Sequence, residues 1–137
     1  MWAGGRLNIP TELKSFYASK LDELGVLQKA IDGNPPSSSI HGGAGEEETV
    51  EHFVYRFPAS SGRIEFASLA PCDELEDVSD ALMNTFSSGD VSVLDIPGGT
   101  GAAMCSLLST LASLRSLGVI PVLPLSVRIM VGDLSPK

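Results

Sequence analysis

The sequence predicts an α/β fold in which a strand–helix–strand unit follows a region of helices and one β-hairpin. Three observations support this. Hydrophobic residues make up 43% of the 137 residues and charged residues 19%, which is typical of a globular chain. Apolar side chains recur at helical spacing in three segments, and short β-branched runs bounded by glycine and proline lie between them. We therefore divide the chain into an N-terminal extension, residues 1–90, and a second part, residues 91–137.

The N-terminal extension is expected to hold four elements. Residues 11–31 form a helix, because leucines and aromatic residues recur there at spacings of three and four. Residues 33–48 form a flexible linker, since a stretch rich in glycine, proline and serine buries too little apolar area to offset its ordering entropy. Residues 52–66 form a β-hairpin around the turn-like sequence PASSG. Residues 73–86 form a second amphipathic helix.

The second part is expected to form a βαβ unit. Residues 91–96 and 127–131 are β-branched runs of strand type, and residues 102–117 place five large apolar side chains on one helical face. Strands joined through a helix in this way are parallel and share a right-handed crossover. The connector at residues 118–125 carries two prolines, and we expect it to lie away from the glycine turn at residues 97–101.

The glycine turn follows the carboxyl end of the first strand, where ligands bind in open α/β sheets. Glycines let the backbone approach a ligand closely, and the next helix directs its free amides at the same place. Asp133, which follows the second strand, could accept two hydrogen bonds from a ribose diol. No Lys-Ser/Thr pair follows Gly101, as a phosphate-binding P-loop requires. The parts together predict a Rossmann-like βαβ unit with a site for an adenosine-type cofactor.

Two motifs resemble those of class I S-adenosylmethionine-dependent methyltransferases. The sequence VLDIPGGTG, residues 93–101, resembles motif I, in which an apolar strand and an acid precede D-x-G-x-G-x-G. Asp95, Gly99 and Gly101 match this pattern, and Pro97 replaces its first glycine. The sequence VGDLSP, residues 131–136, resembles the second motif, with Asp133 one residue nearer to the glycine than in the common G-x-D-x-S-P. The resemblance covers roughly a third of the chain.

The resemblance implies that the chain binds S-adenosylmethionine and that residues 91–137 begin its Rossmann-like domain. Asp95 would hold the amino group of the cofactor, Gly99 and Gly101 would line its methionine part, Asp133 would bind the ribose, and Leu134 would pack on the adenine. The implied cofactor-binding residues are Asp95, Pro97, Gly98, Gly99, Thr100, Gly101, Asp133 and Leu134. No metal ligand and no catalytic residue is assigned. The methyltransferase sheet is incomplete here, so we expect a fragment of a longer enzyme, inactive alone, or a chain that completes its sheet as a homo-oligomer or with a second chain.

Charge and cysteine usage set expectations for partners. Of the formal net charge of −8, residues 91–137 contribute +1 (two acids and three bases) and residues 1–90 contribute −9 (15 acids and six bases). An acidic surface disfavours nucleic acid and anionic membranes, so we expect a small-molecule or protein methyl acceptor. The two cysteines have no metal-type spacing and the N-terminus has no secretory signal, which favours the cytoplasm.

Other interpretations remain open at this stage. The chain could be a non-catalytic dimerisation module with an inert Rossmann-like remnant. It could also be a nucleotide-dependent oxidoreductase, although Met104 stands where G-x-G-x-x-G/A requires a small residue. Asp95 could simply satisfy nearby backbone amides, and Asp133 could cap a helix. Phe16 and Tyr17 could cover the cofactor, but packing in a helical core is the expectation for them.

Overall fold

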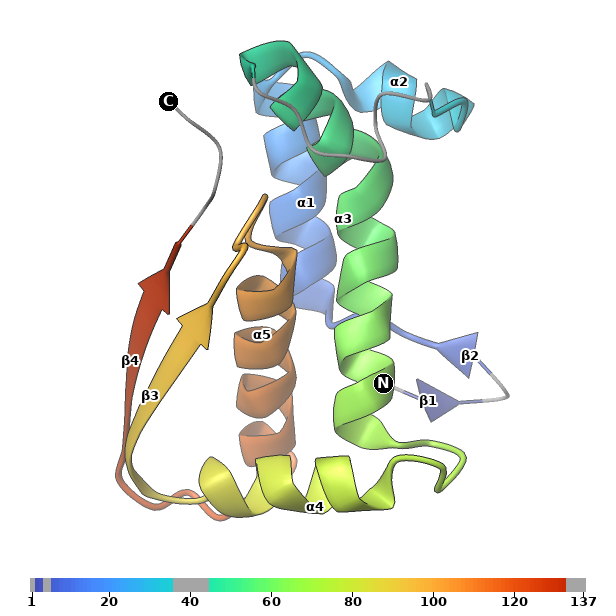
Figure 1. The fold of residues 1–137 in the computed structure, drawn as a ribbon. Helices are drawn as coiled ribbons and strands as arrows, with labels where there is room; N and C mark the ends of the chain where they lie inside the picture. The colour runs from blue at the N-terminus through green and yellow to red at the C-terminus, as the bar shows by residue number, and fades with distance from the viewer. Residues whose placement is uncertain (1, 4–5, 36–44, 133–137) are drawn as a thin grey trace.

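The computed structural model describes residues 2–3, 6–35 and 45–132 and shows a mixed α/β fold. Its elements are β1 (Trp2–Ala3), β2 (Arg6–Leu7), α1 (Thr11–Glu23), α2 (Leu27–Asp32), α3 (Glu46–Leu69), α4 (Glu76–Thr85), β3 (Gly89–Asp95), α5 (Ala102–Ser116) and β4 (Leu125–Val131). In Figure 1, α1, α3 and α5 run beside one another, α4 crosses at one end, and β3 and β4 lie along the free side of α5. Within the described ranges, none of the helices combines the length and the apolar character that crossing a bilayer needs.

The prediction of a β-hairpin at residues 52–66 is wrong, because this segment lies within the long helix α3. The predicted linker at 33–48 is wrong in part for the same reason, since Glu46–Glu48 form the first turn of α3. Three carboxylates are favourable there, where the helix dipole presents its positive end. Gly33 ends α2 with a φ of +66°, and residues 36–44 of the predicted linker lie outside the described residues.

Pro58 lies inside α3 and explains why a hairpin turn was predicted here. A contact with α1 explains how the helix continues past this residue. A proline inside a helix has no amide hydrogen, so the carbonyl four residues earlier loses its helical donor. That carbonyl belongs to Val54, and the hydroxyl of Tyr17 in α1 donates a hydrogen bond to it. A side chain from another helix thus replaces the backbone donor that Pro58 lacks.

The first core cluster joins α1 to the first half of α3. Its buried residues are Leu13, Leu21, Val26, Phe53, Val54, Phe57 and Ala102. The ring of Tyr17 stacks on that of Phe57, with a centroid distance of 5.4 Å and an angle of 3° between the ring planes. Phe53 and Phe57 lie 4.9 Å apart in a tilted arrangement, a geometry that aromatic pairs prefer. Tyr17 therefore packs in the helical core, as expected.

The single helix predicted for residues 11–31 is instead two helices. Gly25 adopts a φ of +66°, and the amide of Val26 donates to the carbonyl of Leu21 over 2.9 Å. The amide of Gly25 donates to Asp22, also over 2.9 Å, which completes a Schellman C-terminal motif. The motif turns Val26 into the core, and α2 starts at the next residue.

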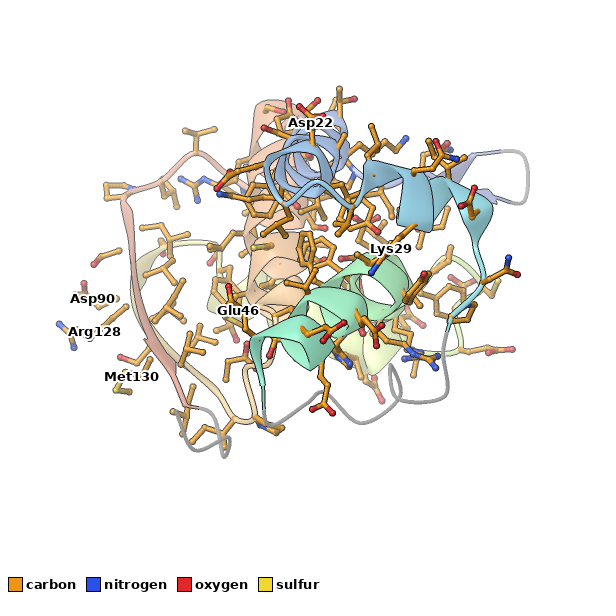
Figure 2. The ribbon with its side chains drawn as sticks, turned by 90° about the horizontal axis from the view of Figure 1, so that it is seen from above. Asp22, Lys29, Glu46, Asp90, Arg128 and Met130 are labelled. Atoms are coloured by element: carbon orange, nitrogen blue, oxygen red, sulfur yellow. The ribbon has the colours of Figure 1, made fainter. Side chains whose placement is uncertain are left out.

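The βαβ prediction is confirmed in its elements and in the direction of its strands. β3 and β4 are parallel, in a register that runs from Gly89 opposite Leu125 to Asp95 opposite Val131. Alternate residues of both strands, including Val91 and Val127, pack against α5 in the second core cluster. The opposite face is exposed, and in Figure 2 the labelled side chains of Asp90, Arg128 and Met130 point away from the helices. The amide of Gly89 donates to the carbonyl of Pro124 over 2.8 Å, so the proline-containing connector lies where the strands begin, away from the glycine turn.

Candidate cofactor site at the carboxyl end of the sheet

The glycine turn, residues 97–101, is held directly against the end of β4. The amide of Gly132 donates to the carbonyl oxygen of Asp95 over 3.0 Å, and the amide of Gly98 donates to the carbonyl oxygen of Gly132 over 2.8 Å. These two bonds extend the ladder of the sheet beyond its last paired residues. The end of β4, the end of β3 and the glycine turn therefore meet at one edge, where α/β sheets bind ligands.

The glycines of the turn are required for two different reasons. Gly98 is buried, and a β-carbon at this position would lie 2.2 Å from Cγ1 of Val131, so a larger residue fits only if the side chain of Val131 moves. Gly99 and Gly101 have φ angles of +50° and +76°, which side chains disfavour. A β-carbon on Gly99 would meet no atom within 4 Å, so the space in front of this residue is open.

The N-terminus of α5 faces the turn without a side-chain cap. Gly101 is its N-cap residue, and no side-chain hydrogen bond caps the helix. The first intrahelical bond runs from the amide of Cys105 to the carbonyl of Gly101 over 2.9 Å. The amides of the first turn therefore have no partner within the helix, and together with the helix dipole they favour a negatively charged or strongly accepting ligand.

Asp95, the last residue of β3, brings a carboxylate to the same edge. Its position in the strand alternation places it on the face of Val91 and Val93, which pack against α5. Its Oδ2 is buried and has no hydrogen-bond partner among the described residues. A buried carboxylate oxygen without a partner is costly, so a donor from outside the described residues, such as a ligand or water, would stabilise this atom. Among the described residues, no backbone amide donates a hydrogen bond to this oxygen.

The structure brings together six of the eight residues predicted for the cofactor. They are Asp95, Pro97, Gly98, Gly99, Thr100 and Gly101, and they lie in one continuous segment. Pro97 and Gly99 are exposed, Thr100 is half-buried, and Gly98 is buried beneath the turn surface that they form. Asp133 and Leu134 lie outside the described residues, and the last described residue before them, Gly132, is bonded to both Asp95 and Gly98.

A second set of buried polar side chains, which the sequence did not reveal, lies on α3 and α5, two helices that contact each other. Ser61, Glu65, Ser106 and Thr110 are at most 1% exposed, and their side-chain oxygens have no hydrogen-bond partner among the described residues. We call these four residues the polar seam. Burial raises the pKa of Glu65 to about 7, although Lys14 acts in the opposite direction. Residues 61 and 65 are four positions apart and so share a face of a helix. This spacing would have indicated the seam if the segment had been predicted to be helical.

The remaining titratable groups of the described residues form no candidate metal centre. The described part of the chain contains no group of three histidine, cysteine or acidic side chains that could hold a metal ion. Both cysteines are free, Cys72 being exposed and Cys105 half-buried. Burial raises the pKa of the Cys105 thiol, which disfavours its reactive thiolate form.

Comparison with known proteins adds no relative. No family model, curated protein or solved structure matches this chain. A function for the chain therefore has to be argued from its own residues and their geometry.

Proposed function

We propose that this chain binds S-adenosylmethionine and is the cofactor-binding part of a class I methyltransferase with a Rossmann-like core. One observation carries the proposal: at the carboxyl end of β3, Oδ2 of Asp95 has no hydrogen-bond partner among the described residues and lies beside a glycine turn and the uncapped N-terminus of α5. The motif at residues 93–101 ends at this edge of the sheet, and Val131 and Gly132, the described part of the motif at residues 131–136, lie at the same edge.

The arrangement suits the charged methionine part of the cofactor. In this proposal Asp95 accepts a charge-assisted hydrogen bond from the ammonium group, and the first-turn amides of α5 donate to the carboxylate. Gly99 and Gly101 leave the backbone open for close approach. When bound, the cofactor supplies an electrophilic methyl group, and its transfer depends mainly on orientation and on exclusion of water. We assign no catalytic residue.

The acceptor and the compartment are also proposals. The acidic residues 1–90 support a small-molecule or protein acceptor rather than a nucleic acid. Two free cysteines support a reducing compartment, the cytoplasm. The electrophoretic mobility of DNA and RNA with added protein tests the proposed class of acceptor. A retarded band at physiological salt would contradict a small-molecule or protein acceptor. Imaging of the tagged full-length protein in cells tests the proposed compartment, and an extracytoplasmic signal would contradict it.

Isothermal titration tests the cofactor proposal. We expect the chain to bind S-adenosylmethionine and S-adenosylhomocysteine and not NAD. Asp95→Asn, which keeps the shape of the side chain, should weaken binding by about 1–3 kcal/mol through the lost charge-assisted hydrogen bond. Equal affinity in the variant, binding of NAD, or no binding by the folded chain would contradict the proposal.

A matched pair of glycine substitutions controls for strain. Gly101→Ala and Gly118→Ala both place a side chain at a positive φ, +76° and +72°, at opposite ends of α5. Both variants should lose stability to a similar degree. Gly101→Ala should in addition weaken cofactor binding, whereas Gly118→Ala should not. Equal cofactor affinities in the two variants would show that the turn does not contact the ligand.

A second candidate function is an interaction module that completes its sheet with another chain. Within the described residues, neither β3 nor β4 pairs with a further strand, so each offers a free edge. On the outer face, Leu94 is 62% exposed and Met130 50% exposed, at neighbouring positions of the two strands. Sedimentation of the chain distinguishes the two candidates. The interaction module would be favoured if the chain forms a dimer and does not bind the cofactor, and if the double substitution Leu94→Lys with Met130→Lys dissociates this dimer.

A further inference from the structure

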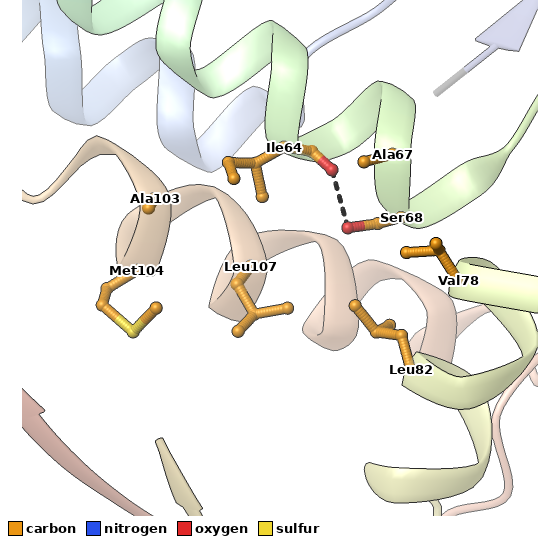
Figure 3. A pocket seen from close by; sticks show the side chains of 8 residues that line it. All are labelled: Ile64, Ala67, Ser68, Val78, Leu82, Ala103, Met104 and Leu107. Carbon is orange, nitrogen blue, oxygen red and sulfur yellow. Dashed lines mark hydrogen bonds between the residues drawn. The ribbon is translucent and has the colours of Figure 1, made fainter. Parts of the chain in front are cut away.

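A pocket with a volume of about 240 Å³ lies between α3, α4 and α5. Its lining residues are Ile64, Ala67, Ser68, Val78, Leu82, Ala103, Met104 and Leu107. Figure 3 shows that α3 contributes one wall, α4 a second, and α5 a third. Leu107 is buried, whereas Val78 remains 48% exposed at the side of α4. The pocket is therefore enclosed by three helices and still open to a ligand.

The chemistry of the lining restricts what can bind. Among the described residues that line the pocket, Ser68 is the only polar one, and its Oγ already donates to the carbonyl of Ile64 over 2.7 Å, as Figure 3 shows. The backbone carbonyl of Ser68 accepts a hydrogen bond from Oγ of Ser79 over 2.8 Å. None of the described residues that line the pocket carries a charge. A charged ligand would lose its hydration there without compensation, so the lining selects a neutral apolar one.

The size of the pocket matches a single ring with substituents. A cavity of about 150 Å³ lined by aliphatic and aromatic side chains stays dry and binds benzene. The pocket here is larger, at about 240 Å³, and one of its walls carries Met104, whose flexible thioether adapts to different shapes. Water gains few hydrogen bonds against such a lining, so its displacement by an apolar group is favourable.

We propose that this three-helix pocket is a binding site for a small, uncharged apolar molecule, or for a group of that kind, about the size of a substituted benzene ring. The site is separate from the glycine turn, because none of residues 97–101 lines it. It does not rest on the proposed methyltransferase function.

Methyl NMR of the unsubstituted chain with toluene as the probe tests the proposal. Toluene should shift the methyl signals of Ala67, Ala103 and Met104 in a saturable way. The methyls of Ala59 and Ala112, exposed on the same helices α3 and α5, serve as internal controls and should not move. Benzoate, which has a similar ring with a charge, should cause no shift in the pocket. Shifts that do not saturate, that spread equally to the controls, or that benzoate reproduces would overturn the proposal.

Filling the pocket gives a second test. Ala67→Leu places three further carbon atoms in the pocket, and Ala59→Leu adds the same atoms on the exposed side of α3. We expect the first variant to bind toluene at least about tenfold more weakly and the second to bind it as the unsubstituted chain does. Equal affinity in both variants would overturn the proposal, and binding of S-adenosylmethionine should not differ between them.

Discussion

The two halves of α3 are both buried but are held by opposite chemistry. The first half places Phe53 and Phe57 against Tyr17 of α1, in an apolar and aromatic contact. The second half places Ser61 and Glu65 in the polar seam against α5, where four side chains have oxygens without partners among the described residues. Burial alone therefore does not tell how a contact contributes to stability. The contribution of the first contact should stay constant over the pH range in which Glu65 titrates, whereas the contribution of the second should fall when Glu65 loses its proton.

The largest effect is expected from the aromatic half. Phe57 is 2% exposed, and Phe57→Ala should lower the free energy of unfolding by about 3–5 kcal/mol, through lost apolar burial and the cavity that remains. Phe16→Ala is the matched control, because Phe16 contacts Phe57 but is 41% exposed. Urea denaturation measures both values. Similar losses in the two variants would show that the stacked core does not hold α3 to α1.

The next effect comes from the polar half and depends on pH. The pKa of Glu65 is raised from 4.5 to about 7 by burial, so between these values the folded chain keeps a proton that the unfolded chain has lost. Stability should therefore fall as the pH rises through this window, by roughly 3 kcal/mol in total, and stay lower above it. The measurement is the free energy of unfolding between pH 4 and pH 8, conditions that bracket the two pKa values.

Two carboxylate-to-amide variants isolate the contribution of the seam. Glu65→Gln keeps the size of the side chain but cannot ionise, so this variant should lose the slope that the unsubstituted chain shows. Glu47→Gln removes a carboxylate that is exposed on the same helix and should retain the slope. A slope that persists in Glu65→Gln would assign the pH dependence to other groups and would end the contrast between the two halves of α3.

The sequence predicted the second part of the chain better than the first. The elements at residues 89–131 follow from local patterns: β-branched runs, a glycine turn and one apolar helical face. These patterns also placed six predicted site residues in one segment. The helix α3 could not be predicted in this way, because PASSG has the composition of a turn and its helical form depends on a contact with α1. The polar seam was hidden by the same error, since residues 61 and 65 share a face only in a helix.

The smallest effect concerns Pro58, where the two halves of α3 meet. Tyr17→Phe keeps the ring on Phe57 but removes the hydroxyl that donates to the carbonyl of Val54, and should cost about 1–2 kcal/mol. Pro58→Ala restores the helical donor to that carbonyl, so in this background Tyr17→Phe should be nearly neutral. The double-mutant cycle from urea denaturation should thus give a coupling of about 1–2 kcal/mol. An equal cost of Tyr17→Phe in both backgrounds would mean that the hydroxyl of Tyr17 stabilises the fold independently of Pro58. The packing on either side of Pro58 would then have to hold α3 together as one helix. The stability of each half of α3 would in that case depend on the other half.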